Sequence, residues 1–367
     1  MKTLGIILAA VLLLGAAFFL LRPAQASPGI PEEENEQVPA ITVVAEGLEI
    51  PWDIALLPGG SMLVTERPGR LLLIENGERK EIAIEGDVLH RGEGGLLGIT
   101  LHPDFKNNRF LYLYFSAPGE NGQTKNHVER YVFDGESLSA RTTILTGIPG
   151  ALYHDGGRME FGPDGYLYIA TGDATKGQLA QDPTSLAGKI LRVEDDGSIP
   201  ANNPSGTAIY SSGHRNPQGL AWDAAGRLWE TEHGPTGEKG ACCHDEINLI
   251  KAGGNYGWPL YIGDESTEGT VAPALHSGTG TWAPASAAIV GSSLFFGGLR
   301  GEALYEATLD GERVVELKEH FKGEFGRIRT VRVGPDGMLY LTTSNRDGRG
   351  SAASGDDKIL KVNPESL

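Results

Sequence analysis

Apolar and polar residues alternate in short stretches along this chain, and a turn motif precedes most of these stretches. The segments FGPDGYLYIATGD (161–173) and VGPDGMLYLTTSN (333–345) are near copies of each other. Weaker copies occupy residues 56–77, 101–116, 222–234 and 288–311. The PDG sequence favours a tight turn, and the Leu-Tyr alternation after it is typical of a half-buried β-strand. The six copies therefore predict one recurring β unit.

The spacing of the copies indicates which fold repeats this unit. Their central leucines are Leu63, Leu111, Leu167, Leu228, Leu294 and Leu339, which are 48, 56, 61, 66 and 45 residues apart. A propeller blade, which is a four-stranded sheet with its loops, takes roughly 40–50 residues. We therefore predict an all-β fold, a six-bladed β-propeller with four-stranded antiparallel blades. A β-sandwich or two tandem β domains would not explain a recurring unit.

The N-terminal residues differ from the rest of the chain. An apolar run from residue 4 to 21 is followed by Ala24-Gln25-Ala26, which is typical of a secretory signal peptide and its cleavage site. The run is long enough for an uncleaved membrane anchor, which is the alternative. We predict a signal peptide over 1–26, a Pro- and Glu-rich disordered linker over 27–40, and one catalytic propeller domain over 41–367. The protein is then periplasmic or secreted.

The charge and the missing motifs exclude several function classes. The formal net charge of -17 disfavours binding to nucleic acid. No GxGxxG, P-loop or GxSxG motif occurs in the sequence, so nucleotide-dependent and serine-hydrolase chemistry lack support.

Several polar, Gly-rich segments lie beside the repeat copies, at 91–105, 153–165, 211–223 and 323–337. His154 is a candidate general base, because histidine titrates near neutral pH. Arg327 and Arg329 alternate on one face of a predicted strand, where two guanidiniums can bind carboxylates or stabilise an oxyanion. Pairing with surface acids on a solvated strand is the alternative for these two arginines.

The segment EHGPTGEKGACCHDEIN (232–248) contains both cysteines of the chain. Carboxylates next to Gly and Pro turns can build a calcium site, here from Gly234-Pro235 and Asp245-Glu246. Zinc usually requires spaced cysteine pairs, which Cys242 and Cys243 do not form. In an oxidising compartment we expect these two residues to form a vicinal disulfide, with free thiols as the alternative.

Taken together, these segments resemble the soluble PQQ-dependent glucose/sorbosone dehydrogenase family, in particular its aldose sugar dehydrogenases. The motifs that carry the resemblance are GEGGLLGITLHPDF, HDGGRMEFGPDGYLYIATGD, GHRNPQGLAWD, EHGP…DEINLIKAGGNYGWP and GRIRTVRVGPDG. The resemblance runs from about Gly47 to Pro364. It implies a six-bladed propeller that binds PQQ and Ca²⁺, oxidises an aldose at C1 to a lactone, and passes electrons to an external acceptor such as a quinone, a cytochrome or a dye. It leaves the oligomeric state open.

The resemblance also implies roles for particular residues. His154 matches the general base, and Gly234 and Pro235 match the pair whose carbonyls hold the calcium beside PQQ. Glu246 and the carbonyl of Tyr256 match a second calcium site. The positions expected to contact the cofactor or substrate are Glu93, Arg215, Asn216, His233, Asp245, Arg300, Arg327 and Arg329. An aspartate that some relatives use toward PQQ is replaced here, at the position we assign to Thr343.

Two other functions remain open from the sequence. Calcium-dependent lactonases also use six-bladed propellers, and propellers often serve as non-catalytic binding modules. The paired arginines Arg327 and Arg329 favour an anionic cofactor over a neutral lactone.

Overall fold

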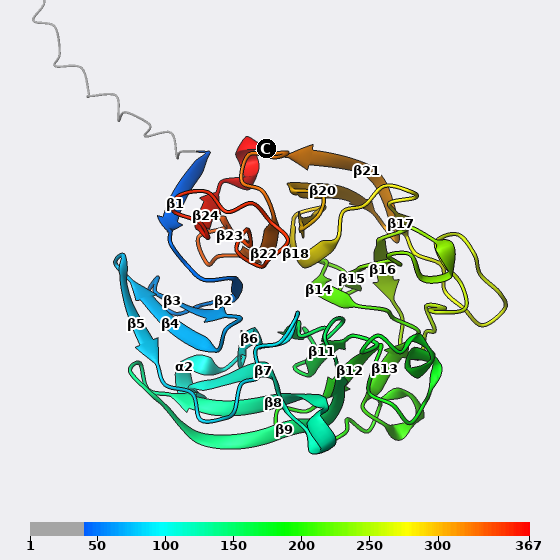
Figure 1. Cartoon of the computed structure of the whole chain (residues 1–367), viewed down its shortest axis with the longest axis horizontal. Helices are drawn as coiled ribbons and strands as arrows, with labels where there is room; N and C mark the ends of the chain where they lie inside the picture. Colours follow the sequence, from blue (N-terminus) through cyan, green and yellow to red (C-terminus); the bar gives the residue numbers. More distant parts are fainter. Residues whose placement is uncertain (1–39) are drawn as a thin grey trace, which may run out of the picture. The chain divides into compact units, whose positions relative to one another are not determined.

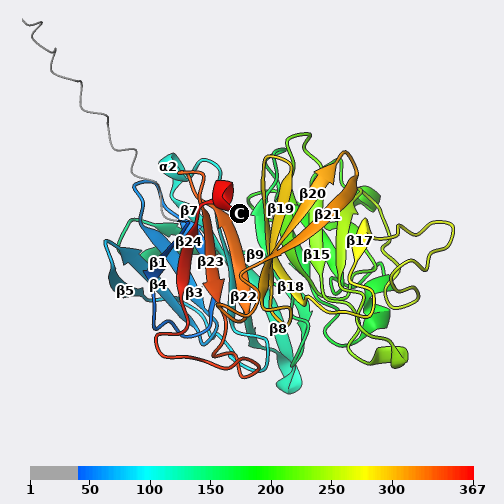
Figure 2. The same ribbon diagram turned by 90° about the horizontal axis from the view of Figure 1, so that it is seen from above.

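The computed structural model of the protein describes residues 40–367. Within this part of the chain, twenty-four strands form six four-stranded antiparallel sheets. Figure 1 shows the sheets as blades around a central axis, and Figure 2 shows the same blades from the side. The predicted all-β, six-bladed propeller with four-stranded blades is therefore confirmed.

The chain builds the blades in sequence order, each from the inside outwards. Blade 1 consists of β2 (Pro51–Leu56), β3 (Met62–Glu66), β4 (Arg70–Glu75) and β5 (Glu78–Ile82). Blade 2 consists of β6 (Leu96–Leu101), β7 (Phe110–Pro118), β8 (Thr124–Phe133) and β9 (Leu138–Gly150). Blade 3 consists of β10 (Met159–Phe161), β11 (Leu167–Thr171), β12 (Lys189–Val193) and β13 (Ile209–Ser212). Blade 4 consists of β14 (Pro217–Trp222), β15 (Leu228–Glu232), β16 (Glu246–Ile250) and β17 (Leu275–His276). Blade 5 consists of β18 (Pro284–Val290), β19 (Ser293–Gly298), β20 (Ala303–Asp310) and β21 (Arg313–His320).

Blade 6 joins the two ends of the described chain. It contains β22 (Ile328–Val333), β23 (Leu339–Thr343), β24 (Ile359–Val362) and, as its outer strand, β1 (Ile41–Ala45). Ile41 pairs with Val362, and the blue β1 lies beside the red β24 in Figure 1. The inner strands β2, β6, β10, β14, β18 and β22 each contact the next one around the axis, and β22 contacts β2. Pairing of the first strand with the last therefore closes the ring.

The repeat copies fall on equivalent strands. The six central leucines lie in β3, β7, β11, β15, β19 and β23, the second strand of each blade, and all six are buried. The expectation of half-buried strands was wrong for β11, which is buried along its whole length. Leu167 packs into the core on one side of this strand, and Tyr168 packs into the core on the other. Neighbouring blades cover both faces of a sheet, so alternation here separates two cores rather than core from solvent.

The PDG sequences form the tight turns that the pattern predicts. In the first copy, the N–H of Gly162 donates to the carbonyl of Tyr166 across the turn between β10 and β11. Gly165 has a φ of 82°, a left-handed conformation that glycine adopts without strain. Gly337 repeats this conformation between β22 and β23, with a φ of 77°.

Helices are short in the described residues. They comprise α2 (Phe105–Asn108) and the 3-10 turns η1 (Glu120–Gly122), η2 (Gly177–Gln181), η3 (Pro204–Gly206), η4 (Glu238–Gly240) and η5 (Pro364–Ser366). From residue 40 onwards, no helix combines the length and the apolar character that a membrane crossing requires. The predicted signal peptide and linker fall on residues 1–40, of which only Ala40 is described.

The four polar segments found in the sequence share one structural position. Each runs through a loop into the inner strand of a blade, namely β6, β10, β14 and β22. These loops precede inner strands that lie side by side around the axis, so their side chains meet at one mouth of the central channel.

Candidate active site

The candidate site is a cavity of about 620 Å³ at this mouth of the channel. A smaller cavity of about 210 Å³ continues from it and shares its residues Glu93, Tyr153, His233, Leu299 and Arg349. A third cavity of about 990 Å³ lies at the opposite ends of the inner strands and is lined largely by apolar residues such as Leu57, Phe161 and Ile289. The predicted site residues gather at the first mouth and not at this larger opening.

His154 forms a hydrogen-bonded pair with Asp173 in the larger of the two connected cavities. Nδ1 of His154 lies 2.7 Å from Oδ1 of Asp173, which is almost completely buried. The other carboxylate oxygen of Asp173 accepts the indole N–H of Trp258 at 2.8 Å, and Oδ1 also accepts the N–H of Thr175. A carboxylate at Nδ1 fixes the tautomer that carries the proton there, which leaves Nε2 with a free lone pair. The pair is therefore arranged for Nε2 to act as a base.

The backbone at His154 is unusual for a residue with a side chain. Its φ is 62°, and its carbonyl lies so close to Gly172 that a Cβ on that glycine would come within 1.9 Å of it. Asn216 helps to hold this loop, because its Oδ1 accepts the N–H of Gly156 at 3.1 Å. Non-glycine residues with positive φ are concentrated at functional sites, where surrounding contacts impose the conformation.

Glu93 links the histidine loop to an arginine from blade 6. One oxygen of Glu93 accepts the backbone N–H of His154 at 3.0 Å, and the other pairs with Arg349. Burial opposes the charged form of Glu93, but Arg349, the His154 N–H and the nearby His233 outweigh it and lower its pKa to about 2. Glu93 therefore carries a full negative charge at neutral pH.

Arginines surround the cavity, and the partners differ from one arginine to the next. Arg327 donates from Nε and Nη2 to Asp347 at 3.0 and 2.7 Å, and Arg329 approaches the same carboxylate at 3.8 Å. Burial opposes ionisation of Asp347, but these two guanidiniums lower its pKa below the ordinary value. Arg300 is exposed and makes no ion pair within residues 40–367. Arg327 and Arg329, which were predicted to share one face, therefore both approach the same buried aspartate, Asp347.

The corner at Gly234 and Pro235 depends on close backbone contact. A Cβ on Gly234 would lie 1.8 Å from the carbonyl oxygen of Cys243, so only glycine fits there. Asp245 holds the corner: its Oδ1 accepts the Gly234 N–H at 2.9 Å, and its Oδ2 accepts the N–H groups of Trp282 and Ala283. Oδ2 of Asp245 also accepts the Thr281 hydroxyl at 2.9 Å, so this carboxylate fixes the backbone around the corner while it lines the cavity.

Glu246 and Tyr256 lie on the far side of this corner. They line a small hollow of about 10 Å³ together with Glu232, Gly234 and Pro235. Glu246 in β16 lies directly opposite Glu232 in the neighbouring strand β15. Burial raises the pKa of Glu246 well above its ordinary value, and the charge of Glu232 adds to this effect.

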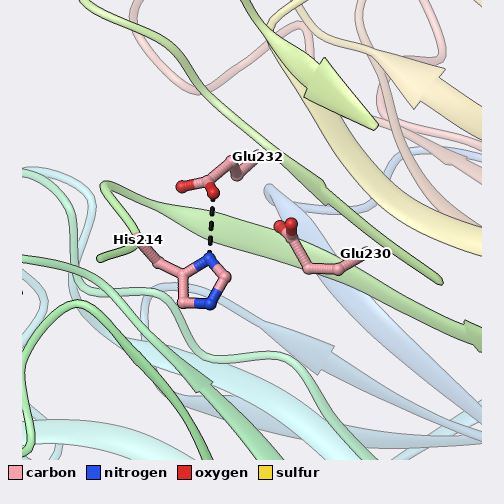
Figure 3. A group of neighbouring side chains, drawn as sticks. All are labelled: His214, Glu230 and Glu232. Atoms are coloured by element: carbon pink, nitrogen blue, oxygen red, sulfur yellow. Dashed lines mark hydrogen bonds and ion pairs between the residues drawn. The ribbon is translucent and has the colours of Figure 1, made fainter. Parts of the chain in front are cut away.

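A polar group beneath the corner was not found from the sequence. Figure 3 shows His214, Glu230 and Glu232, whose ligand-type atoms lie within 4.8 Å of one another. Both nitrogens of His214 are engaged, Nδ1 with Glu232 at 3.0 Å and Nε2 with Ser211 at 2.8 Å. Burial, followed by the charge of Glu232, raises the pKa of Glu230 well above its ordinary value. We interpret this group as a hydrogen-bonded network that supports the site.

The structure brings most of the sequence-predicted residues to one place. Those lining the 620 Å³ cavity are Glu93, His154, Arg215, His233, Gly234, Pro235, Asp245, Arg300 and Arg327. Arg329 lines the connected smaller cavity, while Asn216 is buried behind the histidine loop.

Burial lowers the pKa of His233 to about 4, so this imidazole is neutral at physiological pH. Cys242 and Cys243 form the expected vicinal disulfide, and Cys243 lines the cavity.

Thr343 lies away from the cavities. Its hydroxyl lies 3.3 Å from Oδ1 of the buried Asp357, inside blade 6. The acid of this segment that reaches the arginines is Asp347. The sequence pattern did not distinguish these two positions, because the loop after β23 has no regular period.

Sequence reasoning missed Asp173, Trp258, Glu238, Asp347 and Arg349, all of which are at the site. A signal existed for one of them. Asp173 ends the copy at 161–173, at the position that Asn345 occupies in the copy at 333–345, so it follows the second strand of a blade as Asn345 does. The remaining four lie outside the strands, in loops and in the short 3-10 turn η4, where no periodic pattern marks a functional residue.

The fold and the site define a six-bladed propeller with a histidine–aspartate pair in an arginine-rich cavity. The chain belongs to the Glucose / Sorbosone dehydrogenase family, whose model matches residues 48–352. It is 41% identical to a PQQ-bound aldose sugar dehydrogenase structure from Streptomyces coelicolor, with a TM-score of 0.81, covering 88% of this chain and 98% of that one. It is 34% identical to aldose sugar dehydrogenase YliI of Escherichia coli K12, covering 89% of this chain and 93% of the relative. It is also 34% identical to quinoprotein glucose dehydrogenase B of Acinetobacter calcoaceticus, over 62% of this chain and 54% of that protein. The resemblance noted from the sequence motifs is thereby confirmed.

Proposed function

We propose that this protein oxidises aldose sugars at C1 to lactones, with PQQ as the electron-accepting cofactor and Ca²⁺ at the cofactor. The observation that carries the proposal is the His154–Asp173 pair in a cavity lined by guanidiniums. The relatives support it: one similar structure is PQQ-bound, and the curated relatives are named as an aldose sugar dehydrogenase and a quinoprotein glucose dehydrogenase.

The donor set of the cavity fits an anionic, acceptor-rich cofactor. Nε of Arg215, Nε2 of His233 and Nδ2 of Asn216 are buried and lack hydrogen-bond partners among the described residues. The exposed Arg300 and the buried Arg327 add positive charge. Arg215, Arg300, Arg327 and Arg329 would hold a quinone that carries carboxylates, because guanidiniums bind carboxylates in bidentate geometry. Asn216 would add the N–H donors of its amide. When bound, the quinone supplies the hydride-accepting chemistry.

Two calcium positions belong to the proposal. The carbonyls of Gly234 and Pro235 would ligate the ion at the cofactor, since Ca²⁺ accepts backbone oxygens. Glu246, with the carbonyl of Tyr256, would hold a second and structural ion, and the small hollow that these residues line supports this assignment.

His154 would remove the proton from the anomeric hydroxyl of the sugar through Nε2. Asp173 holds the Nδ1 proton and, as a buried carboxylate, stabilises the imidazolium that forms. Glu93 fixes the loop through the His154 N–H and would accept a hydrogen bond from a sugar hydroxyl. Trp258 holds Asp173 in place and shields it from water.

Reconstitution tests the proposal. Purified protein, stripped of metal, would be loaded with PQQ and Ca²⁺, and dye reduction followed with glucose, galactose and xylose. We expect sugar-dependent dye reduction that requires both additions. His154→Ala should keep PQQ binding and lose about 10²–10⁴-fold in turnover, the usual contribution of general base catalysis. PQQ binding without activity on any aldose would overturn the sugar assignment, and lactone hydrolysis without PQQ would favour the lactonase alternative.

We also propose that the protein is exported and acts outside the cytoplasm, with an external electron acceptor. The supporting observations are the signal-type N-terminus and the disulfide between Cys242 and Cys243, a bond typical of oxidising compartments. N-terminal sequencing of the exported protein would test both export and cleavage after residue 26.

A further inference from the structure

One arginine of the cavity has an acidic partner that differs from the partners of the others. Arg215 is only 4% exposed, and its Nη2 lies 2.5 Å from Oε1 of Glu238, whose side chain is 40% exposed. In the pair of Arg327 with Asp347, by contrast, both side chains are buried. Arg215 therefore combines a buried guanidinium with a carboxylate that already contacts solvent.

Glu238 lies on a small hairpin at the rim of the cavity. The hairpin runs from Thr236 to Cys242, which form an isolated β-bridge, and the N–H of Gly237 donates to the carbonyl of Ala241 at 2.9 Å. The second carboxylate oxygen of Glu238 accepts the N–H of Thr236 within the same hairpin. The hairpin thus makes its own hydrogen bonds, and the Glu238 carboxylate is its ion-pair contact with the cavity.

The other contacts of the Arg215 guanidinium are uncharged. Its Nη1 donates to the carbonyl of His233 at 3.3 Å, and its guanidinium lies 5.4 Å from the centre of the Trp258 ring. Its Nε has no hydrogen-bond partner in the described chain. Glu238 thus supplies the negative charge at this guanidinium.

We propose that Glu238 is an internal substitute for a cofactor carboxylate at Arg215, and that it sets the affinity for the cofactor. This inference rests on the proposed function, in which Arg215 binds a carboxylate of PQQ. A ligand carboxylate at Arg215 would compete with the Glu238 carboxylate, because two carboxylates at one guanidinium repel each other. The exchange keeps a charge partner on the buried Arg215 while the half-exposed Glu238 turns to water, so its cost in desolvation is small.

Cofactor affinity without turnover is the direct test. PQQ would be titrated into metal-loaded protein without sugar and followed by quenching of tryptophan fluorescence, since Trp258 lies beside Arg215. Glu238→Gln removes the competing charge and keeps the shape, so we expect the Kd for PQQ to fall about tenfold, the effect of losing a moderate competing ion pair. Glu312→Gln is the matched control, because Glu312 is also exposed and its ion pair among the described residues is with the surface Lys251.

A double-mutant cycle makes the test specific to the pair. Arg215→Ala should weaken PQQ binding. Adding Glu238→Gln to it should then change the Kd less than twofold, because the Arg215 guanidinium for which Glu238 and the PQQ carboxylate compete has been removed. Thermal melts of each variant show that it is folded.

The outcomes separate this inference from the proposed function. If the wild type binds PQQ and Glu238→Gln leaves the Kd equal or higher, the inference is wrong and the proposed function stands. If the wild type does not bind PQQ, both are wrong. A lower Kd in Glu238→Gln that persists without Arg215 would also overturn the inference, since the gain would not come from this pair.

Discussion

The imidazole of His154 and the carboxylate of Asp173 are joined at 2.7 Å although 19 residues separate them. The histidine lies in the loop before β10, and the aspartate follows β11 of the same blade. The carboxylate fixes the tautomer of the imidazole, which leaves Nε2 free for the base role that we propose.

Asp173→Asn should reduce kcat by about 10²–10⁴-fold, because the amide can donate toward Nδ1 and favour the wrong tautomer. PQQ affinity should change little, since Asp173 lies behind the base. Steady-state dye reduction together with PQQ titration would measure both. The exposed Asp87→Asn is the control, and an unchanged kcat in Asp173→Asn would remove the positioning role.

Gly234→Ala should weaken Ca²⁺-dependent PQQ binding and lower stability by about 1–3 kcal/mol, the usual cost of overpacking. The added Cβ would collide with the Cys243 carbonyl and push the corner apart. Calcium titrations and urea melts would check this. Gly280→Ala is the control, because its new Cβ would lie 3.3 Å from the Ser277 carbonyl oxygen, a much milder approach, so its effect should be clearly smaller than that of Gly234→Ala.

Arg300→Ala and Arg327→Ala should separate binding from stability. Both should weaken PQQ binding, but only Arg327→Ala should also destabilise the fold, by about 3–5 kcal/mol, because it leaves the buried Asp347 without its main partner. The exposed and unpaired Arg300 carries no such role. Equal melting temperatures for the two variants would contradict this account.

Asp155→Asn should flatten the pH dependence of stability. Burial raises the pKa of Asp155 from 3.8 to about 6, and Glu93 adds to the effect. The folded protein therefore holds this proton more tightly than the unfolded chain does. The resulting stability is complete below pH 3.8 and is lost as the pH rises through about 6, a change of about 3 kcal/mol.

Asparagine cannot ionise, so the variant should lack this loss. Urea unfolding at several pH values from 4 to 8 would compare the slopes of the two proteins, with Asp87→Asn as the control. Parallel slopes for wild type and Asp155→Asn would show that Asp155 titrates normally.

The six recurring copies of the turn-and-strand motif were sufficient to predict the fold. Strand alternation and the PDG turns are local properties, and their recurrence at six places required a recurring sheet. The same pattern misjudged burial in β11, because alternation does not tell whether the second face meets solvent or another blade. It likewise located the polar loops but not the residues in them that lack periodicity, such as Asp347 and Arg349.

By itself, the sequence determined the recurring blade, the number of blades and the loops that carry His154, Arg215, Gly234 and Arg327. Only the tertiary structure decided which of these loops meet at one mouth of the channel, and which acid pairs with which arginine. The physical reason is ring closure. Pairing of β1 with β24 places six inner strands around one axis, and contacts such as Arg349 with Glu93, 256 residues apart, exist only once that ring is complete.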